Sequence, residues 1–458
     1  MGWVMIFNPT PFSLIKLPLG RLDMTHRNLN NHMLFLAASS AGKTKSIIEP
    51  LITAVFDDDR NTGDNTSLVV YDFKFSEKKG SLSSFVYSQS LQSESKLNTF
   101  FLNFHRPEYS IRANPLLGVD GVATAVELSE ALISNFNRGQ RENSFWAKSA
   151  ISLLAATICF FSSKAKEMCT LPHCIELLTT RSAKELIEIL SADADASRLL
   201  SPITSAKDAV EQLAGQVSSL QAELARYADK KIYWILSGNS EGFSFELNSK
   251  KRPGRLVIAN DPENVGYNSP LVGLCLTAAF RRMTRIGEVT KSMFVIDESG
   301  TVLIPQLESK ITTCRDPFKI SISLITQDYS QLENLYSKPS AQTIRGSCNT
   351  KGYGKLSEGV DYIEKHFGTY KKSQGSVTNN AQGQRSVSTH FKDEPRVKGE
   401  YVGQLKAGEF LVDSNNKRFK QKVKLRDYDL MDLPEITFVH PKLIEQNFEK
   451  IRDEIASL

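Results

Sequence analysis

The fold is decided by the stretch Met33-Leu34-Phe35-Leu36-Ala37-Ala38-Ser39-Ser40-Ala41-Gly42-Lys43-Thr44. Its apolar start, residues 33–36, predicts a buried strand. The residues after Thr44 predict a helix with one apolar side, made of Ile47, Ile48, Leu51, Ile52, Val55 and Phe56. A strand, a turn containing Gly-Lys-Thr and a helix together direct backbone N–H groups at a polyphosphate. We therefore predict a phosphate-binding loop formed by Ala38, Ser39, Ser40, Ala41, Gly42, Lys43 and Thr44.

The loop differs from the common pattern at its first position, where Ala37 stands in place of Gly. That position closes the strand, so an alanine with negative φ fits there, and neither Ala37 nor the methyl group of Ala41 removes a ligand. We expect Lys43 to reach the β- and γ-phosphates of a nucleoside triphosphate. The Thr44 hydroxyl is expected to join the Mg²⁺ shell.

A second stretch, Lys291-Ser292-Met293-Phe294-Val295-Ile296-Asp297-Glu298, predicts a buried strand that ends in two carboxylates. In enzymes with a phosphate-binding loop, one carboxylate orders Mg²⁺ and another polarises the attacking water. We expect Asp297 to take the first role and Glu298 the second. Many strands end in solvated acidic residues, so Asp297 and Glu298 alone do not indicate a catalytic site. They indicate one in combination with the predicted phosphate-binding loop at residues 37–44.

Three further apolar runs have polar carboxyl ends, at residues 68–74, 256–261 and 320–327. This arrangement is typical of a parallel sheet, because ligands bind outside the carboxyl ends of its strands. Gln327 ends the last of these runs. It is either a sensor beside the γ-phosphate or a cap at a strand-to-helix turn, and the run alone does not separate the two.

The length of 458 residues indicates two or three domains, since domains average about 150 residues. A net charge of +5 permits a polyanionic partner without requiring one. The six cysteines have no metal-site spacing, which favours reduced thiols in the cytoplasm. Residues 1–19 are too short and too broken by proline for a spanning helix, and residues 150–161 indicate a buried core helix, so no transmembrane segment is expected.

Four consecutive helical patterns between residues 122 and 227 exceed a single crossover between strands. We therefore predict an α/β nucleotide-binding domain with a mostly parallel central sheet, interrupted by an inserted all-helical domain. The predicted division is 1–117, 118–229 (helical), 230–440, and a C-terminal helix at 441–458. The polar residues 371–400 predict a mobile loop or a β-hairpin; their basic side chains either contact a polyanion or are simply solvated.

Several motifs resemble, in order and spacing, the coupling-protein ATPases of type IV secretion and conjugation (the TraG/TraD family), from about residue 20 to 430. They are Asn31-His32, Ala37–Thr44, Tyr71-Asp72-Phe73-Lys74, Arg112-Ala113-Asn114-Pro115-Leu116, Phe145-Trp146 with Ala150, Leu153 and Leu154, Val295-Ile296-Asp297-Glu298, Arg315, Thr326-Gln327-Asp328, Gln331-Leu332-Glu333-Asn334-Leu335-Tyr336 and Leu405-Lys406-Ala407-Gly408-Glu409-Phe410. The chain departs from the family at Phe75, where Gly is usual. It also departs in having no membrane helices ahead of the loop and no long acidic tail.

The resemblance implies a RecA-like motor domain that binds ATP and Mg²⁺ and assembles as a homo-hexamer. It implies that Arg315 acts as a finger on a neighbour's γ-phosphate; without the family, Arg315 would be taken for a surface arginine. The implied function is to drive DNA, bound to a relaxase, into a type IV secretion or conjugation channel. The implied place is the cytoplasm, at the inner face of the cell membrane. Because membrane helices are missing ahead of the loop, either a partner attaches the chain to the membrane, or the chain is a soluble variant, or its N-terminus has been lost.

Two other functions remain open on the sequence. The chain is alternatively a coupling platform for protein effectors, in which ATP turnover is secondary. A cellular DNA pump of the FtsK or HerA kind is the third possibility, and the helical insertion and the Thr326-Gln327-Asp328 segment count against it. DNA-stimulated, salt-sensitive ATP hydrolysis separates a DNA motor from an effector receptor.

Overall fold

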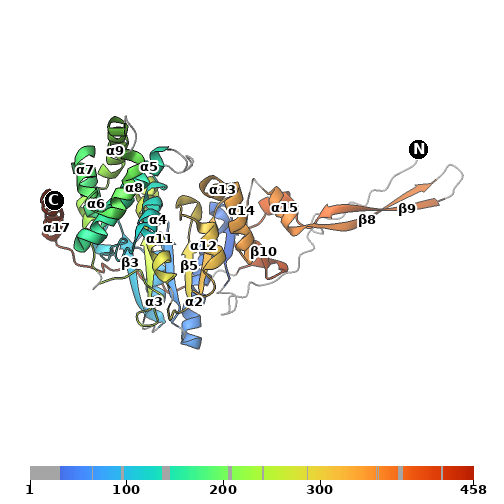
Figure 1. Ribbon diagram of the computed structural model, residues 1–458. Helices are drawn as coiled ribbons and strands as arrows, with labels where there is room; N and C mark the ends of the chain where they lie inside the picture. Colours follow the sequence, from blue (N-terminus) through green and yellow to red (C-terminus); the bar gives the residue numbers. More distant parts are fainter. Residues whose placement is uncertain are drawn as a thin grey trace.

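The computed structural model describes residues 31–63, 65–93, 97–136, 145–204, 209–239, 242–285, 287–356, 358, 360–379, 385–423 and 427–458. Figure 1 shows three parts: a central sheet with helices on its faces, a helical block at one end, and a long hairpin at the other. The expectation for residues 1–19 falls outside the described residues.

The central sheet has nine strands in the order β11-β10-β7-β1-β6-β5-β2-β4-β3. The strands from β7 to β3 run parallel, while β10 and β11 are antiparallel at one edge. Strands that are buried on both faces need apolar residues throughout, and this explains why the apolar runs in the sequence are continuous rather than alternating. Their bounds are Met33–Leu36 (β1), Ser67–Asp72 (β2), Asn98–Asn103 (β3), Gly254–Ala259 (β4), Ser292–Ile296 (β5), Ile320–Thr326 (β6), Thr350–Tyr353 (β7), Glu409–Ser414 (β10) and Lys417–Lys422 (β11).

Alternate side chains of each strand enter two separate hydrophobic cores, as the pleat requires. Met33 and Phe35 pack into a core with the helices α2 (Glu49–Thr62) and α3 (Leu82–Gln92). Leu34 and Leu36 pack into the larger core on the opposite face. That face is covered by α11 (Val265–Met283), α12 (Leu307–Thr313), α13 (Tyr329–Tyr336) and α14 (Lys338–Ser347).

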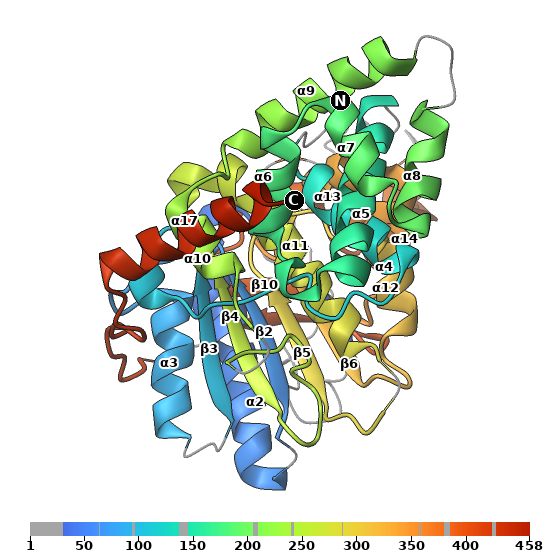
Figure 2. The ribbon, with the colours of Figure 1, turned by 60° about the vertical axis from the view of Figure 1, so that its left-hand side comes forward.

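The helical block lies between β3 and β4 and stands beyond one end of the sheet (Figure 2). It contains α4 (Val122–Ile133), α5 (Phe145–Lys164), α6 (Leu171–Thr180), α7 (Ala183–Leu190), α8 (Ala194–Thr204), α9 (Ala209–Ala225) and α10 (Lys230–Leu236). The C-terminal helix α17 (Pro441–Ala456) returns to pack against α6 and α10. Since α10 contacts α6 and α17, we propose that this domain ends after α10 rather than at residue 229.

One helix among the described residues, α5, is long and apolar enough to cross a membrane, with a mean hydropathy of 1.5 in its most apolar window. Most of that window, 61%, is buried inside the helical block. Core helices of globular domains share these properties, so α5 is weak evidence for a membrane span.

The polar segment predicted as a loop or a hairpin forms a hairpin of two antiparallel strands, β8 (Thr369–Asn379) and β9 (Arg385–Pro395). Two short helices flank it, α15 (Asp361–Phe367) and α16 (Gly399–Gly403). Figure 1 shows the hairpin projecting away from the sheet on the side opposite the helical block. The hairpin alternative is therefore confirmed for the described residues.

A buried ion pair joins the sheet to α2. The Arg255 side chain of β4 is fully buried, forms an ion pair with Asp59 and stacks over the Phe56 ring, with its guanidinium carbon 4.0 Å from the ring centroid. The other Asp59 oxygen, Oδ1, accepts a hydrogen bond from the Thr66 amide at 2.5 Å. Breaking such a pair leaves an uncompensated charge in the interior.

We therefore expect Asp59→Asn to lower the free energy of unfolding by about 3–5 kcal/mol, measured as a shift of the urea midpoint. The matched control is Asp57→Asn on the same helix. Asp57 pairs with Arg60 at the surface, where both side chains are nearly half exposed, so the control should cost less than about 1 kcal/mol. Equal losses in the two variants would contradict a structural role for the buried pair.

Candidate nucleotide site

The predicted phosphate-binding loop follows β1 directly. A short turn at Ser39–Ala41 leads to Gly42, whose φ of +76° is a left-handed conformation that favours glycine. The next helix begins at Thr44, and the Ser46 amide donates to the Gly42 carbonyl at 3.0 Å. The loop therefore presents the start of a helix at the carboxyl edge of the parallel strands, the arrangement that binds phosphates.

The unusual Ala37 is accommodated by a neighbouring glycine that sequence reasoning missed. A Cβ at Gly354, just after β7, would lie 2.7 Å from the Cβ of Ala37, so a glycine at 354 makes room for the methyl group. Two backbone bonds also hold the loop: the Ala38 amide donates to Lys355 at 2.9 Å, and the Gly408 amide donates to Ala41 at 3.1 Å. The resemblance included Gly408, but no pattern in the sequence pointed to Gly354 or Lys355.

The strand order brings the acidic pair to the loop, because β6 alone separates β1 from β5. The Lys43 ammonium donates to Glu298 Oε1 at 2.9 Å and to the Ala37 carbonyl at 2.9 Å. Both charged side chains are about 5% exposed. Glu298 has a φ of +50°, so the backbone makes a left-handed turn directly after β5.

Asp297, beside Glu298, is in a strongly negative environment. Burial, the Glu298 carboxylate and the Asp72 carboxylate raise the pKa of Asp297 to about 7, and the charge of Lys43 and a hydrogen bond from the Glu298 backbone amide oppose them. Asp72 ends β2 and accepts hydrogen bonds from the amide and the hydroxyl of Ser83 at 2.9 and 2.6 Å. Burial raises the pKa of Asp72 as well. Sequence reasoning quoted Asp72 in a motif but did not assign it to the site.

These residues fit a magnesium ion and a polyphosphate. Three buried carboxyl groups face one buried ammonium group, so the cluster lacks positive charge, and oxygen donors are what Mg²⁺ prefers. The Thr44 side chain is half-buried at the first turn of the helix. A divalent cation near Asp297 and Thr44 would balance the excess negative charge.

Gln327 follows the last residue of β6, between the carboxyl ends of β1 and β5, and is half-buried. The cap of the next helix, α13, is Asp328, whose side chain accepts a hydrogen bond from the Ser330 amide at 2.9 Å. The strand-to-helix turn is thus capped by Asp328. The role of Gln327 as a phosphate sensor stays a prediction.

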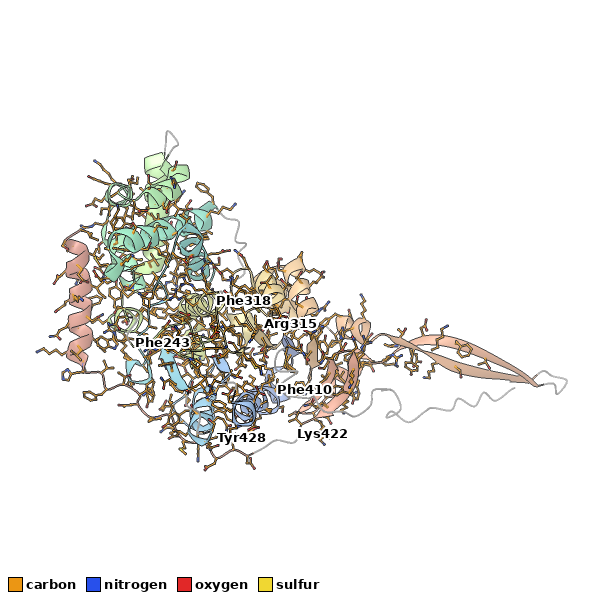
Figure 3. All side chains as sticks on the ribbon, turned by 60° about the horizontal axis from the view of Figure 1, so that its bottom comes forward. Phe243, Arg315, Phe318, Phe410, Lys422 and Tyr428 are labelled. Carbon is orange, nitrogen blue, oxygen red and sulfur yellow. The ribbon has the colours of Figure 1, made fainter. Side chains whose placement is uncertain are left out.

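Arg315 lies at the other end of β6, in the loop between α12 and β6 that also carries Phe318 (Figure 3). Its side chain is 50% exposed and its Nε lies 3.9 Å from Asp316. The seven residues of β6 separate Arg315 from Gln327 by about 20 Å. Arg315 therefore cannot reach the phosphate-binding loop of its own chain, and its role as a finger on a neighbour's γ-phosphate stays a prediction.

Comparison with known proteins identifies the class. A family model described as "Type IV secretory system Conjugative DNA transfer" matches residues 16–446, so the chain belongs to this family. Comparison with curated protein sequences gives no match.

Among solved structures, the chain is similar to the bacterial conjugative coupling protein TrwBdeltaN70 in its unbound monoclinic form. The TM-score is 0.67 and the identity 15%, with 89% of this chain and 87% of that chain covered. It is also similar to the plasmid coupling protein TrwB in complex with ADP and Mg²⁺, with a TM-score of 0.66, 16% identity and coverage of 89% and 88%. These likenesses confirm the predicted fold, an α/β nucleotide-domain architecture with a helical insertion.

The raised pKa of Asp297 leads to a stability prediction. Its pKa rises from the ordinary 3.8 to about 7 on folding, so the folded protein binds more protons than the unfolded chain between pH 4 and 7, and stability falls as the pH rises through this window. Asp297→Asn removes this penalty. We expect the variant to be more stable than wild type by up to about 4 kcal/mol at pH 8, and by progressively less toward pH 4, as measured by urea midpoints without nucleotide. A gain independent of pH would contradict the raised pKa.

Proposed function

We propose that the loop at residues 38–44 binds ATP together with Mg²⁺. Lys43 would hold the β- and γ-phosphates, and Thr44 and Asp297 would hold the metal, which supplies charge neutralisation on the phosphates. The buried cluster of Lys43, Asp297 and Glu298 carries this proposal. The printed titles of related TrwB structures support it, since they name complexes with ADP and Mg²⁺ and with a non-hydrolysable ATP analogue.

Glu298 is the proposed general base of ATP hydrolysis. In the structure it is engaged by Lys43 at 2.9 Å, and phosphate binding would compete for the ammonium group and release the carboxylate toward a water molecule. Gln327 would orient the γ-phosphate from the end of β6. The same ion pair would keep the base occupied until a nucleotide arrives.

The proposed role of this activity is to drive DNA, bound to a relaxase, into a type IV secretion channel. The family's conjugative DNA transfer supports this role. The chain would act as a homo-hexamer at the inner face of the cell membrane, next to the channel and a membrane-anchoring partner. A ring is supported by the position of Arg315, which would serve only a neighbour's nucleotide.

The first test is the ATPase rate of the full chain with and without DNA. Lys43→Ala should abolish nucleotide binding. Glu298→Gln should retain nucleotide binding but lose roughly 10²- to 10⁴-fold in turnover, since only the proton acceptor is removed. Turnover of the wild type should rise with DNA, and the rise should weaken steeply with salt. A rate indifferent to DNA would point to a receptor for protein effectors instead.

The second test asks whether Arg315 acts between chains. Arg315→Ala should lower turnover by roughly 10³-fold or more while nucleotide binding persists. Mixed with the Lys43→Ala variant, it should recover roughly a quarter of the wild-type rate if subunits exchange at random in a ring. Recovery is expected because a chain with an intact loop then receives an arginine from its neighbour. No recovery in verified mixed assemblies would contradict a finger between chains.

A further inference from the structure

The β8–β9 hairpin extends far from the rest of the molecule. Its strands are paired over eleven residues each, which corresponds to about 35 Å of length. The main contact between these strands and the flanking elements is with α15, at the foot of the hairpin (Figure 1). A two-stranded hairpin is only marginally stable in water, so one of this length suggests a bound partner along its strands.

The segment from the last turn of α15 to the residue before α16 is basic. Residues 365–398 contain seven Lys or Arg and two Asp or Glu, a net charge of +5, and Asp361, Glu364 and Glu400 flank this segment. The complete chain has 56 Lys and Arg against 51 Asp and Glu, also +5, so the remaining residues are electrically balanced. Between Lys371 and Lys392 there is no acidic residue. This charge distribution favours a polyanion as the partner.

The pairing register places two lysines against each other. Lys372 and Lys392 are direct cross-strand partners, and like charges in this position are destabilising. Lys372 is compensated by Glu394, whose two oxygens lie 3.2 Å from its ammonium group. Lys392 is exposed and forms no ion pair with any residue that the structure describes. The adjacent Phe391 is 70% exposed. A phosphate group near Lys392 would remove the repulsion.

The foot of the hairpin is joined to the nucleotide loop on both sides. The chain enters the hairpin region after Lys355, which accepts from Ala38, and leaves it before Gly408, which donates to Ala41. In addition, the ring of Tyr362 in α15 lies 5.3 Å from that of Tyr329, two residues after Gln327. These contacts connect the foot of the hairpin to both the loop and the end of β6.

We propose that the β8–β9 hairpin is an arm that binds the phosphate backbone of duplex DNA and conveys this binding to the phosphate-binding loop. A two-stranded ribbon fits the major groove of B-DNA, and Lys, Ser, Thr, Asn and Gln side chains are common phosphate and sugar contacts. The inference rests on the proposed function in DNA transfer, and adds the binding element to it.

The test uses the full chain with Lys371→Gln, Arg385→Gln and Lys392→Gln combined. Its matched control removes three exposed lysines of the helical block, Lys164→Gln, Lys166→Gln and Lys184→Gln. Duplex DNA binding is measured from 50 to 200 mM salt. Each lost phosphate contact reduces the slope of log affinity against log salt by about 0.9. The hairpin variant should therefore lose about 2–3 from the slope, while the control keeps the wild-type slope.

A second variant replaces residues 374–390 by Asn-Gly, which closes a short hairpin after the Ser373–Phe391 pair. It should keep the basal ATPase rate and lose stimulation by DNA. If wild type binds DNA and the hairpin variants bind and respond as the control does, the inference is overturned while the proposed function stands. Absence of DNA binding in the wild type would overturn both. A third outcome is that the hairpin variants lose binding to anionic phospholipid vesicles but bind DNA as wild type does. The partner of the hairpin would then be a membrane surface rather than DNA, and the inference would be overturned.

Discussion

The placement of β6 between β1 and β5 is the constraint on which the site depends. It sets Lys43, in the loop that follows β1, within 2.9 Å of Glu298, which follows β5, although the two residues are 255 positions apart in the chain. It also sets Gln327 between them at the same edge. Since the carboxyl ends of parallel strands share one edge of a sheet, any chain with this strand order collects these three groups.

The same edge is electrostatically unfavourable without a ligand. Burying charge costs several kcal/mol per ion unless it is paired. Among the described residues, Asp72 and Glu298 raise the pKa of Asp297, and the buried cation Lys43 pairs with Glu298. A protein selected only for stability would replace one of the carboxyl groups by an amide. The retained carboxyl groups, and the left-handed turn at Glu298, are local costs of the kind that functional sites carry.

Much of the fold could be predicted from the sequence, because doubly buried strands are continuous apolar runs; β1, β2, β4, β5 and β6 were found in this way. The strand β7 was missed since it contains Lys351 and Gly352. That glycine is required because a Cβ there would lie 2.3 Å from the Phe35 ring, a long-range contact that no local pattern contains. For the same reason Gly354, which makes room for Ala37, and the return of α17 to α6 could not be predicted.

Both large insertions leave the sheet at the edge that holds the nucleotide loop. The helical block follows the carboxyl end of β3, and the hairpin follows that of β7. The interior of a strand is paired on both sides, so it cannot shift without breaking many backbone hydrogen bonds. The loops at the carboxyl edge are held by individual backbone hydrogen bonds, such as those from Ala38 to Lys355 and from Gly408 to Ala41. Elements attached at this edge are therefore the ones that a change at the phosphates can displace, and the proposed motor function would need its partner-binding elements there rather than at the opposite edge.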